Sequence, residues 1–170
     1  MLLDKNIITE RFILRNIVED DAKDVWEIWS NSENEKFMGD PYESLEEIVS
    51  ICQSTKNCNS YLTVATLKDT GEIIGTCCFG PTKQKNEWGL GYSIKQEHWS
   101  KGYATEIVKG VIKFGCGLRI TDFVADCAIE NSASGRVLQK CGFNLDSIST
   151  FKQSKTNKIF ESHVYKLHVD

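Results

Sequence analysis

The residues best suited to chemistry lie in one short stretch, WSKGYATE, at residues 99–106. The apolar spacing that follows predicts a helix from about residue 102, and the first four amides of a helix lack internal partners. The helix dipole adds partial positive charge there. Because Gly102 has no Cβ, a phosphate could lie directly on these amides, beside Lys101 and Thr105. An ordinary helix start would show the same residues, and the GxxxxGKS/T pattern of nucleotide triphosphate sites is absent.

More polar residues occur at the next predicted strand-to-helix junction. Asn131 opens the segment NSASGRVLQKCGF, and Ser134 stands three residues later. A serine in the first turn of a helix can cap amides, or it can donate a hydrogen bond to a ligand. In the strand expected over residues 87–94, the acid nearest to Gly89 is Glu87, which is either a surface carboxylate or a proton acceptor.

The periodicity of the chain predicts the elements that position these residues. Strands are expected over residues 7–17, 61–67, 72–80, 87–94 and 121–127, with two more around a loop at 153–158. Helices are expected from Asp20 or Asp21, over 44–55 with Ser44 and Glu47 as a capping box, over 102–116, and from Asn131 or Ser132 to a cap at Gly142. Gly89 and Gly91 predict a bulge or the close approach of another group to the backbone. This order predicts a single mixed α/β domain over residues 1–170, with a mostly antiparallel sheet.

The order GLGYSI, HWSKGYATE and ADCAIENSASGRVLQKCGF resembles the GCN5-related N-acetyltransferase (GNAT) family, in particular the branch of the ribosomal-protein N-terminal acetyltransferases. The opening TERFILRNI is similar to the TERLxLR start of that branch, and the resemblance covers about residues 8–168. It implies a GNAT-like fold, in which six or seven mostly antiparallel strands, flanked by about four helices, splay around residues 87–94. It also implies transfer of the acetyl group of acetyl-CoA to a primary amine, by direct attack in a ternary complex.

The same resemblance implies the acetyl-CoA site. The family's pyrophosphate loop reads Q/R-x-x-G-x-G/A, which GYA at 102–104 matches, while Trp99 in the first position is familiar in the ribosomal branch. That branch more often has WGKGYAT, so Ser100 departs from it. The implied binding residues are Ser93, Ile94, Trp99, Ser100, Lys101, Gly102, Tyr103, Ala104, Thr105, Asn131 and Ser134. The amides of residues 100–105 would hold the pyrophosphate, an N–H near Ser93 or Ile94 would polarise the thioester, and Asn131 would bind pantetheine.

Glu87 and Ser134 are the implied catalytic residues. Many family members have a glutamate where this chain has Gly89, so Glu87, two residues earlier on the same strand face, could act as a base through water. Glu161 and water alone are the alternatives. Leu138 stands where many relatives have a tyrosine acid, whereas Ser134 matches a serine of the ribosomal branch. We therefore expect Ser134 to donate to the CoA sulfur.

The resemblance leaves the acceptor open. It favours a protein N-terminal amine, and an aminoglycoside, a polyamine or a non-catalytic acyl-CoA-binding role are alternatives. Residues 19–47 carry eleven acids and two bases, a charge of -9, against +5 for the remainder. This asymmetry would steer a cationic acceptor to the first two helices, where the family places its acceptor, or it reflects solvated helix faces. Trp26, Trp29 and Phe37 either pack in the core or line that pocket.

Composition narrows the class of protein. Apolar residues make up 41% and charged residues 26%, as in soluble domains, and no apolar run approaches the roughly 18 residues of a membrane span. A net charge of -4 argues against nucleic-acid binding. The absence of a signal-peptide core predicts a cytoplasmic protein. We expect a monomer or a homodimer, and the sequence does not decide between them. Seven cysteines without a CxxC pair predict reduced, buried thiols, and the isolated histidines predict no metal site.

Overall fold

The computed structural model describes residues 1–37 and 39–170, which form one sheet in the order β1-β2-β3-β4-β5-β6-β8-β7. Its strands are β1 (Ile7–Ile8), β2 (Phe12–Asn16), β3 (Tyr61–Leu67), β4 (Ile73–Pro81), β5 (Glu87–Ile94), β6 (Asp122–Ala128), β7 (Asn144–Lys152) and β8 (Ile159–His168). Among these described strands, only β5 and β6 pair in parallel. The predicted mixed α/β fold with a mostly antiparallel sheet is confirmed, with eight strands instead of six or seven.

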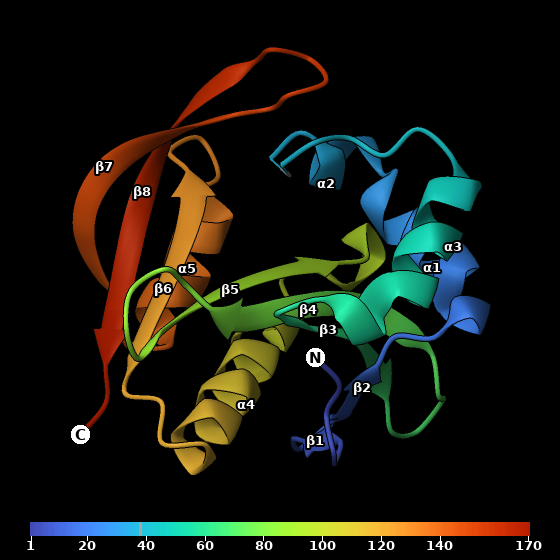
Figure 1. Cartoon of the computed structure of the whole chain (residues 1–170), viewed down its shortest axis with the longest axis horizontal. Helices are drawn as coiled ribbons and strands as arrows, with labels where there is room; N and C mark the ends of the chain where they lie inside the picture. The colour runs from blue at the N-terminus through green and yellow to red at the C-terminus, as the bar shows by residue number, and fades with distance from the viewer. Residues whose placement is uncertain (38) are drawn as a thin grey trace.

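Helices cover both faces of the sheet (Figure 1). The described residues form α1 (Ala22–Trp29), α2 (Ser32–Glu35), α3 (Leu45–Ser54), α4 (Tyr103–Gly117) and α5 (Ser132–Lys140), with 3-10 turns at Glu19–Asp21, Thr55–Asn57 and Gln96–His98. The short α2 and the 3-10 turns had no periodic signal in the sequence. Among these described helices, none has the length and apolar character that crossing a membrane requires.

Two hydrophobic clusters hold these layers together. On one face, Val108 of α4 and Leu138 of α5 pack with Phe123 of β6. On the other face, Ile28 of α1 packs with Ile48 of α3. Full burial of each such side chain stabilises the fold by about 1.5–3 kcal/mol. The sheet is therefore fixed between α4 and α5 on one side and α1 and α3 on the other.

The first predicted strand, residues 7–17, is in fact two strands. The chain turns after Ile8, and β1 folds back on β2 with Ile7 opposite Leu14. Within the turn, the Thr9 amide donates to the Phe12 carbonyl at 3.0 Å. The prediction of one strand was wrong because the apolar pattern continues through a turn that contacts with α4 stabilise.

The starts of α1 and α3 also differ in detail from the prediction. Ser44 Oγ accepts from the Glu47 amide at 3.3 Å, as a capping box requires, but the Glu47 carboxylate accepts from the Glu43 amide instead of the Ser44 amide. Asp21 precedes α1 without capping it, because its carboxylate binds the Arg15 guanidinium through two bonds of 2.7 Å. Both carboxylates are therefore used for other contacts.

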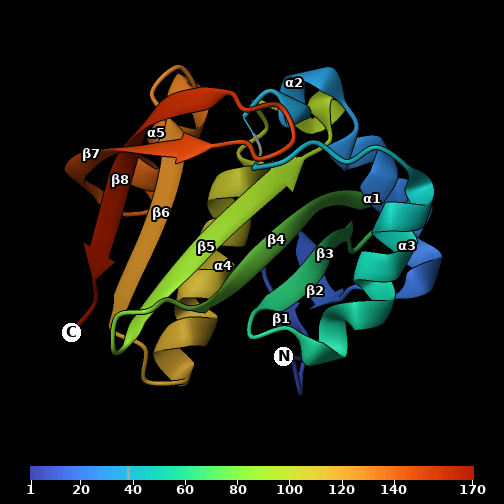
Figure 2. The ribbon, with the colours of Figure 1, turned by 45° about the horizontal axis from the view of Figure 1, so that its top comes forward.

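The parallel pairing of β5 with β6 is short, and this short pairing opens the sheet between the two strands. Pairing covers only residues 87–89 with 122–124, after which β5 continues along β4 and β6 continues along β8. Figure 2 shows the two strands diverging from a shared start. The predicted splay around residues 87–94 is confirmed. Because the strands run in parallel, the helices that follow them, α4 and α5, both begin at the open end.

Candidate functional site

A cleft of about 610 Å³ lies at the open end, between the last residues of β5, the first turns of α4 and α5, and the segment at α2. Its lining includes Ser93, Ile94, Trp99, Ser100, Gly102, Tyr103, Ala104, Thr105, Asn131 and Ser134. Of the predicted binding residues, only Lys101 is absent from the lining; its Nζ lies 3.4 Å from His98 Nδ1. Tertiary structure thus gathers two segments that are separate in sequence into one site.

The segment before α4 presents unpaired amides to this cleft. Within the described residues, the amides of residues 100–105 donate no hydrogen bond. Gly102 is the N-cap and has a left-handed backbone with φ of 77°. A Cβ at this position would meet only Arg11 Nη2, at 3.9 Å, so the space over the amides is open. Free amides and the positive end of the helix dipole together suit an anionic ligand.

The backbone at Ser100 explains why a glycine is expected at this position, but nothing in the structure explains the serine. Its φ is 62°, in the left-handed region, which costs a residue with a Cβ roughly 1–2 kcal/mol. The preceding residue, Trp99, is anchored because its indole N–H donates to the Ile94 carbonyl at 2.9 Å. The loop therefore keeps a conformation that glycine would adopt without strain.

The N-terminal strands fasten the same loop from outside. Arg11 Nε lies 2.6 Å from Glu106 Oε2, and the Arg11 amide and Thr9 Oγ1 each donate to Glu106 Oε1 at 2.7 Å. Arg11 Nη1 also donates to the Lys101 carbonyl at 3.3 Å. Burial acts to raise the pKa of Glu106, but these hydrogen bonds outweigh it and lower that pKa below its ordinary value. No local sequence pattern indicates this contact, because 95 residues separate Arg11 from Glu106.

Ser134 and Asn131 are held at the start of α5. Asn131 Oδ1 accepts from the Ser134 amide at 3.1 Å, which confirms the predicted N-cap. Ser134 Oγ lies 2.9 Å from the hydroxyl of Tyr92 in β5, and either group can donate. Burial raises the pKa of Tyr92 well above its ordinary value, so this phenol stays protonated at neutral pH. Tyr92 lines the cleft, although sequence analysis did not single it out.

Two cations on α5 also line the cleft and were missed. Arg136 and Lys140 are four residues apart, so they lie on one face of the helix. Arg136 Nη1 donates to Ser132 Oγ at 3.1 Å. The spacing of Arg136 and Lys140 in the sequence could have predicted a second contact with an anion.

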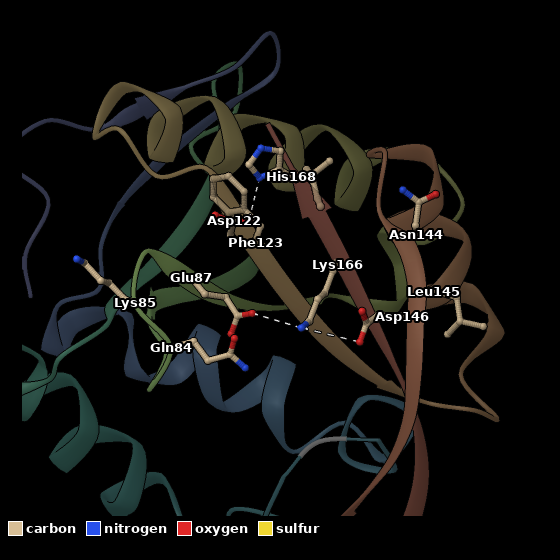
Figure 3. A pocket seen from close by; sticks show the side chains of 11 residues that line it. Gln84, Lys85, Glu87, Asp122, Phe123, Asn144, Leu145, Asp146, Lys166 and His168 are labelled. Atoms are coloured by element: carbon tan, nitrogen blue, oxygen red, sulfur yellow. Dashed lines mark hydrogen bonds and ion pairs between the residues drawn. The ribbon is translucent and has the colours of Figure 1, made fainter. Parts of the chain in front are cut away.

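Glu87 lies outside the cleft, in a second cavity of about 430 Å³ at the start of β5 (Figure 3). Its Oε1 accepts from Thr82 Oγ1 at 2.9 Å, and its Oε2 lies 3.7 Å from Lys166 Nζ. Ser93 is six residues further along, about 20 Å away at roughly 3.3 Å per strand residue. The geometry therefore gives no support to Glu87 as the base, and Glu161, exposed on β8, does not line the cleft either.

The aromatic residues near the first helices divide between core and cleft. Trp29 is 5% exposed, stacks on Tyr42 at 4.8 Å, and donates from Nε1 to Thr76 Oγ1 at 2.9 Å. Trp26 is half-buried and packs against the hydrophobic cluster that contains Trp29, Ile28 and Ile48. Phe37 instead lines the cleft. Of Trp26, Trp29 and Phe37, therefore, only Phe37 lines the cleft.

Several acids of the segment 19–47 are paired with cations from elsewhere in the chain. The loop between β7 and β8 reaches toward the residues before α3 (Figure 2), and there Lys155 Nζ lies 2.9 Å from Glu47 Oε1. Lys95 Nζ of the β5–α4 connection lies 3.4 Å from Asp24 and 3.3 Å from Glu27. These contacts reduce the field that the segment would exert on an approaching cation.

The remaining reactive side chains have structural contacts. All seven cysteines are free, but only Cys52, Cys77 and Cys127 are buried, so the prediction of buried thiols holds for some of them. His98 Nε2 lies 3.1 Å from Glu72 Oε1, and with Glu97 these atoms fall within 4.8 Å of one another. A hydrogen bond between His98 and Glu72 accounts for this cluster.

Residues 11–144 match the family model described as the Acetyltransferase (GNAT) domain. The uncharacterized N-acetyltransferase YoaA of Bacillus subtilis is 30% identical over 166 residues, covering 94% of each chain. RimL, a ribosomal alpha-N-protein acetyltransferase solved with coenzyme A, superimposes with a TM-score of 0.83 at 17% identity, covering 98% of this chain and 99% of that one. AAC(6')-Ib, solved with ribostamycin and coenzyme A, gives a TM-score of 0.75 at 16% identity, covering 94% of each.

Proposed function

The chain belongs to the GNAT acetyltransferase family, and from that premise we propose that it transfers acetyl from acetyl-CoA to a primary amine in a ternary complex. The observation that carries this proposal is the row of unpaired amides at residues 100–105, beside Gly102 at the open end of the splayed sheet. A pyrophosphate needs several N–H donors and no Cβ in its path, and this loop offers both. Arg136 and Lys140 supply further positive charge for phosphate oxygens.

The splay supports the proposed place of pantetheine. Beyond Gly89 the edge of β5 no longer pairs with β6, so its backbone groups are free to bind the amide-rich arm as an added strand. A backbone N–H near Ser93 or Ile94 would then polarise the thioester carbonyl. Asn131 has an amide nitrogen left over from its capping role, and this nitrogen can donate to the same arm.

Ser134 would stabilise the departing sulfur. A CoA thiolate resembles other thiolates, whose conjugate thiols have pKa values of about 8.5, so it needs a hydrogen-bond donor more than a strong acid. Ser134 lines the cleft, and Tyr92 can donate to Ser134 Oγ across 2.9 Å, which leaves the serine proton free to face the ligand. Leu138 is 1% exposed in the core and takes no part.

A protein N-terminal amine is the proposed acceptor, and a small cationic amine such as an aminoglycoside or polyamine is the second candidate. RimL and AAC(6')-Ib, which have this fold, are examples of the two classes. Steering by the acidic segment favours any cation, but its pairing with Lys95 and Lys155 weakens that argument. The acceptor class therefore needs direct measurement.

The acceptor test incubates the protein with acetyl-CoA and a panel of peptides, aminoglycosides and polyamines, followed by mass spectrometry. We expect a mass gain of one acetyl group on at least one amine, with release of CoA. Binding of acetyl-CoA without transfer to any amine in the panel would instead favour a non-catalytic acyl-CoA-binding module.

The cofactor site is tested with Gly102→Glu, measured by calorimetric titration with acetyl-CoA. The carboxylate would occupy the place of the pyrophosphate, and the left-handed φ of 77° would strain the new residue, so binding should be lost. Gly117→Glu is the matched control, because it makes the same change at the far end of α4, where a Cβ meets nothing within 4 Å. Unchanged affinity in Gly102→Glu would refute the site.

A further inference from the structure

One strip of β5 is bare on the face that α1 covers. Gly91 pairs with Cys78 of β4, and Ser93 pairs with Thr76, whose hydroxyl accepts from Trp29 of α1. Gly89 and Gly91 therefore share this face, and neither carries a side chain. A Cβ on Gly91 would come within 3.3 Å of Cys78 Sγ, and one on Gly89 within 3.6 Å of Thr82 Cγ2. The two glycines keep this strip open for another group.

Asp126 of β6 stands across the splay from this strip. The last paired residues are Gly89 and Val124, and Asp126 is two residues beyond Val124, so it lies on the same face about 6.6 Å further along. At the same level on β5 is Gly91. Asp126 is exposed, and within the described residues its carboxylate makes no hydrogen bond or ion pair. A carboxylate with no structural partner thus faces the bare strip at the point where the strands have parted.

The surroundings of Asp126 favour proton uptake. Although the side chain as a whole is exposed, partial burial of its carboxylate, and secondly the charge of Glu87 on β5, raise the pKa of Asp126 above its ordinary value. Glu87 is itself approached by Lys166 of β8, whose Nζ lies 3.7 Å away. The residue paired with Asp126 on β8 is the uncharged Val164. Asp126 is therefore a better proton acceptor than an isolated surface aspartate.

We propose that Asp126 binds the ammonium group of the acceptor and takes its proton, with the acceptor chain lying over Gly89 and Gly91. This inference rests on the proposed acetyl transfer. Asp126, Gly89 and Gly91 do not line the cleft that holds Tyr92 and Ser134. Since β5 and β6 stop pairing at Gly89 and Val124, in this proposal the amine reaches the thioester through the gap between the two strands, a route that the exposed Glu161 and the more distant Glu87 do not share.

The proton balance follows from this arrangement. One proton passes from the ammonium to Asp126, and the freed lone pair on nitrogen forms the C–N bond to the thioester carbonyl carbon. The C–S bond breaks with its electron pair on sulfur, where Ser134 donates a hydrogen bond. The second proton leaves nitrogen as the amide forms and ends on the sulfur, giving the CoA thiol. Asp126 then releases its proton to solvent.

The first experiment compares Asp126→Asn with wild type and with Asp122→Asn, using the best amine from the acceptor panel. Asp122 lies on the same strand and face but at the paired end, so it is the matched control. Asp126→Asn should lower kcat/KM for the amine by about 10²–10⁴-fold, the usual contribution of a general base, with acetyl-CoA affinity unchanged. Wild-type turnover in Asp126→Asn, or an equal loss in Asp122→Asn, would overturn the inference.

A second readout separates proton transfer from simple charge attraction. If Asp126 takes the proton, its loss should lower kcat, and more so for an alkylamine with a pKa of about 10.4 than for an α-amine near 8. A rise in KM alone, equal for both amines, would overturn the catalytic role. If wild type acetylates no amine, the proposed function itself fails, an outcome distinct from an active Asp126→Asn variant.

The bare strip has its own test in Gly91→Ala. The added methyl would narrow the strip beside Cys78, so KM for the amine should rise while acetyl-CoA affinity stays unchanged. Gly117→Ala, with nothing within 4 Å of its Cβ, is the control. An unchanged KM for the amine in a folded Gly91→Ala variant would show that the acceptor does not lie there.

Discussion

The contact between Glu106 and the N-terminal strands predicts a pH-dependent loss of stability in Glu106→Gln. The carboxylate accepts from Thr9 Oγ1, the Arg11 amide and Arg11 Nε at 2.7, 2.7 and 2.6 Å, and its side chain is 15% exposed. Glutamine keeps one neutral oxygen acceptor but turns an N–H toward the guanidinium. Hydrogen bonds to charged groups are worth about 1.5–3 kcal/mol and neutral ones about 0.5–1.5 kcal/mol.

The expected loss is about 1–2 kcal/mol at pH 7, because Arg11 is 42% exposed and water screens part of its charge. For a chain of this size, that corresponds to a fall in Tm of about 4 °C. The pKa of Glu106 is lowered in the folded state, so its contribution is complete above the ordinary carboxyl pKa of about 4.3. It disappears as the pH falls through the lower, folded-state pKa. The difference in stability between wild type and Glu106→Gln should therefore disappear at acidic pH.

Thermal denaturation at pH 7 and near pH 3 measures this gap directly. Glu10→Gln is the matched control, because Glu10 is an exposed neighbour of Arg11 and its replacement should change neither Tm nor the pH profile. Because Arg11 Nη1 also holds the Lys101 carbonyl, Glu106→Gln should in addition weaken acetyl-CoA binding. An equal gap at both pH values, or no gap at pH 7, would refute the reasoning.

Two further predictions concern the cleft. Ser100→Gly should raise Tm, because it removes a left-handed backbone strain of roughly 1–2 kcal/mol. The greater freedom of glycine in the unfolded chain offsets part of this gain, and acetyl-CoA binding should be kept. A lower Tm would contradict the strain at Ser100. Tyr92→Phe should lower kcat up to about tenfold with little change in KM, since one hydrogen bond of about 1 kcal/mol orients Ser134. The double variant Tyr92→Phe with Ser134→Ala should have the same kcat as Ser134→Ala alone. If the two substitutions lowered kcat independently, so that their effects multiplied, Tyr92 would not act through Ser134.

The sequence alone determined those features that depend on residues close together in the chain. Helix periodicity placed α4 and α5 within a few residues, and the cap at Asn131 with Ser134 three positions later follows from one helical turn. Gly102 was predictable for the same reason, because the unpaired amides and the missing Cβ belong to one short loop. The proposed cofactor side of the site was therefore largely predictable from the sequence, apart from the cations Arg136 and Lys140.

Tertiary structure alone decided which distant groups meet. The contact between Tyr92 and Ser134 joins residues 42 positions apart, and that between Arg11 and Glu106 joins residues 95 apart. No local sequence pattern predicts either contact. Glu87 shares a strand face with Ser93, but a shared face does not tell how far apart along the strand two side chains act, and the rise of β5 carries Glu87 to another cavity. Asp126 gains its proposed role because β5 and β6 stop pairing at Gly89, which depends on what packs around both strands.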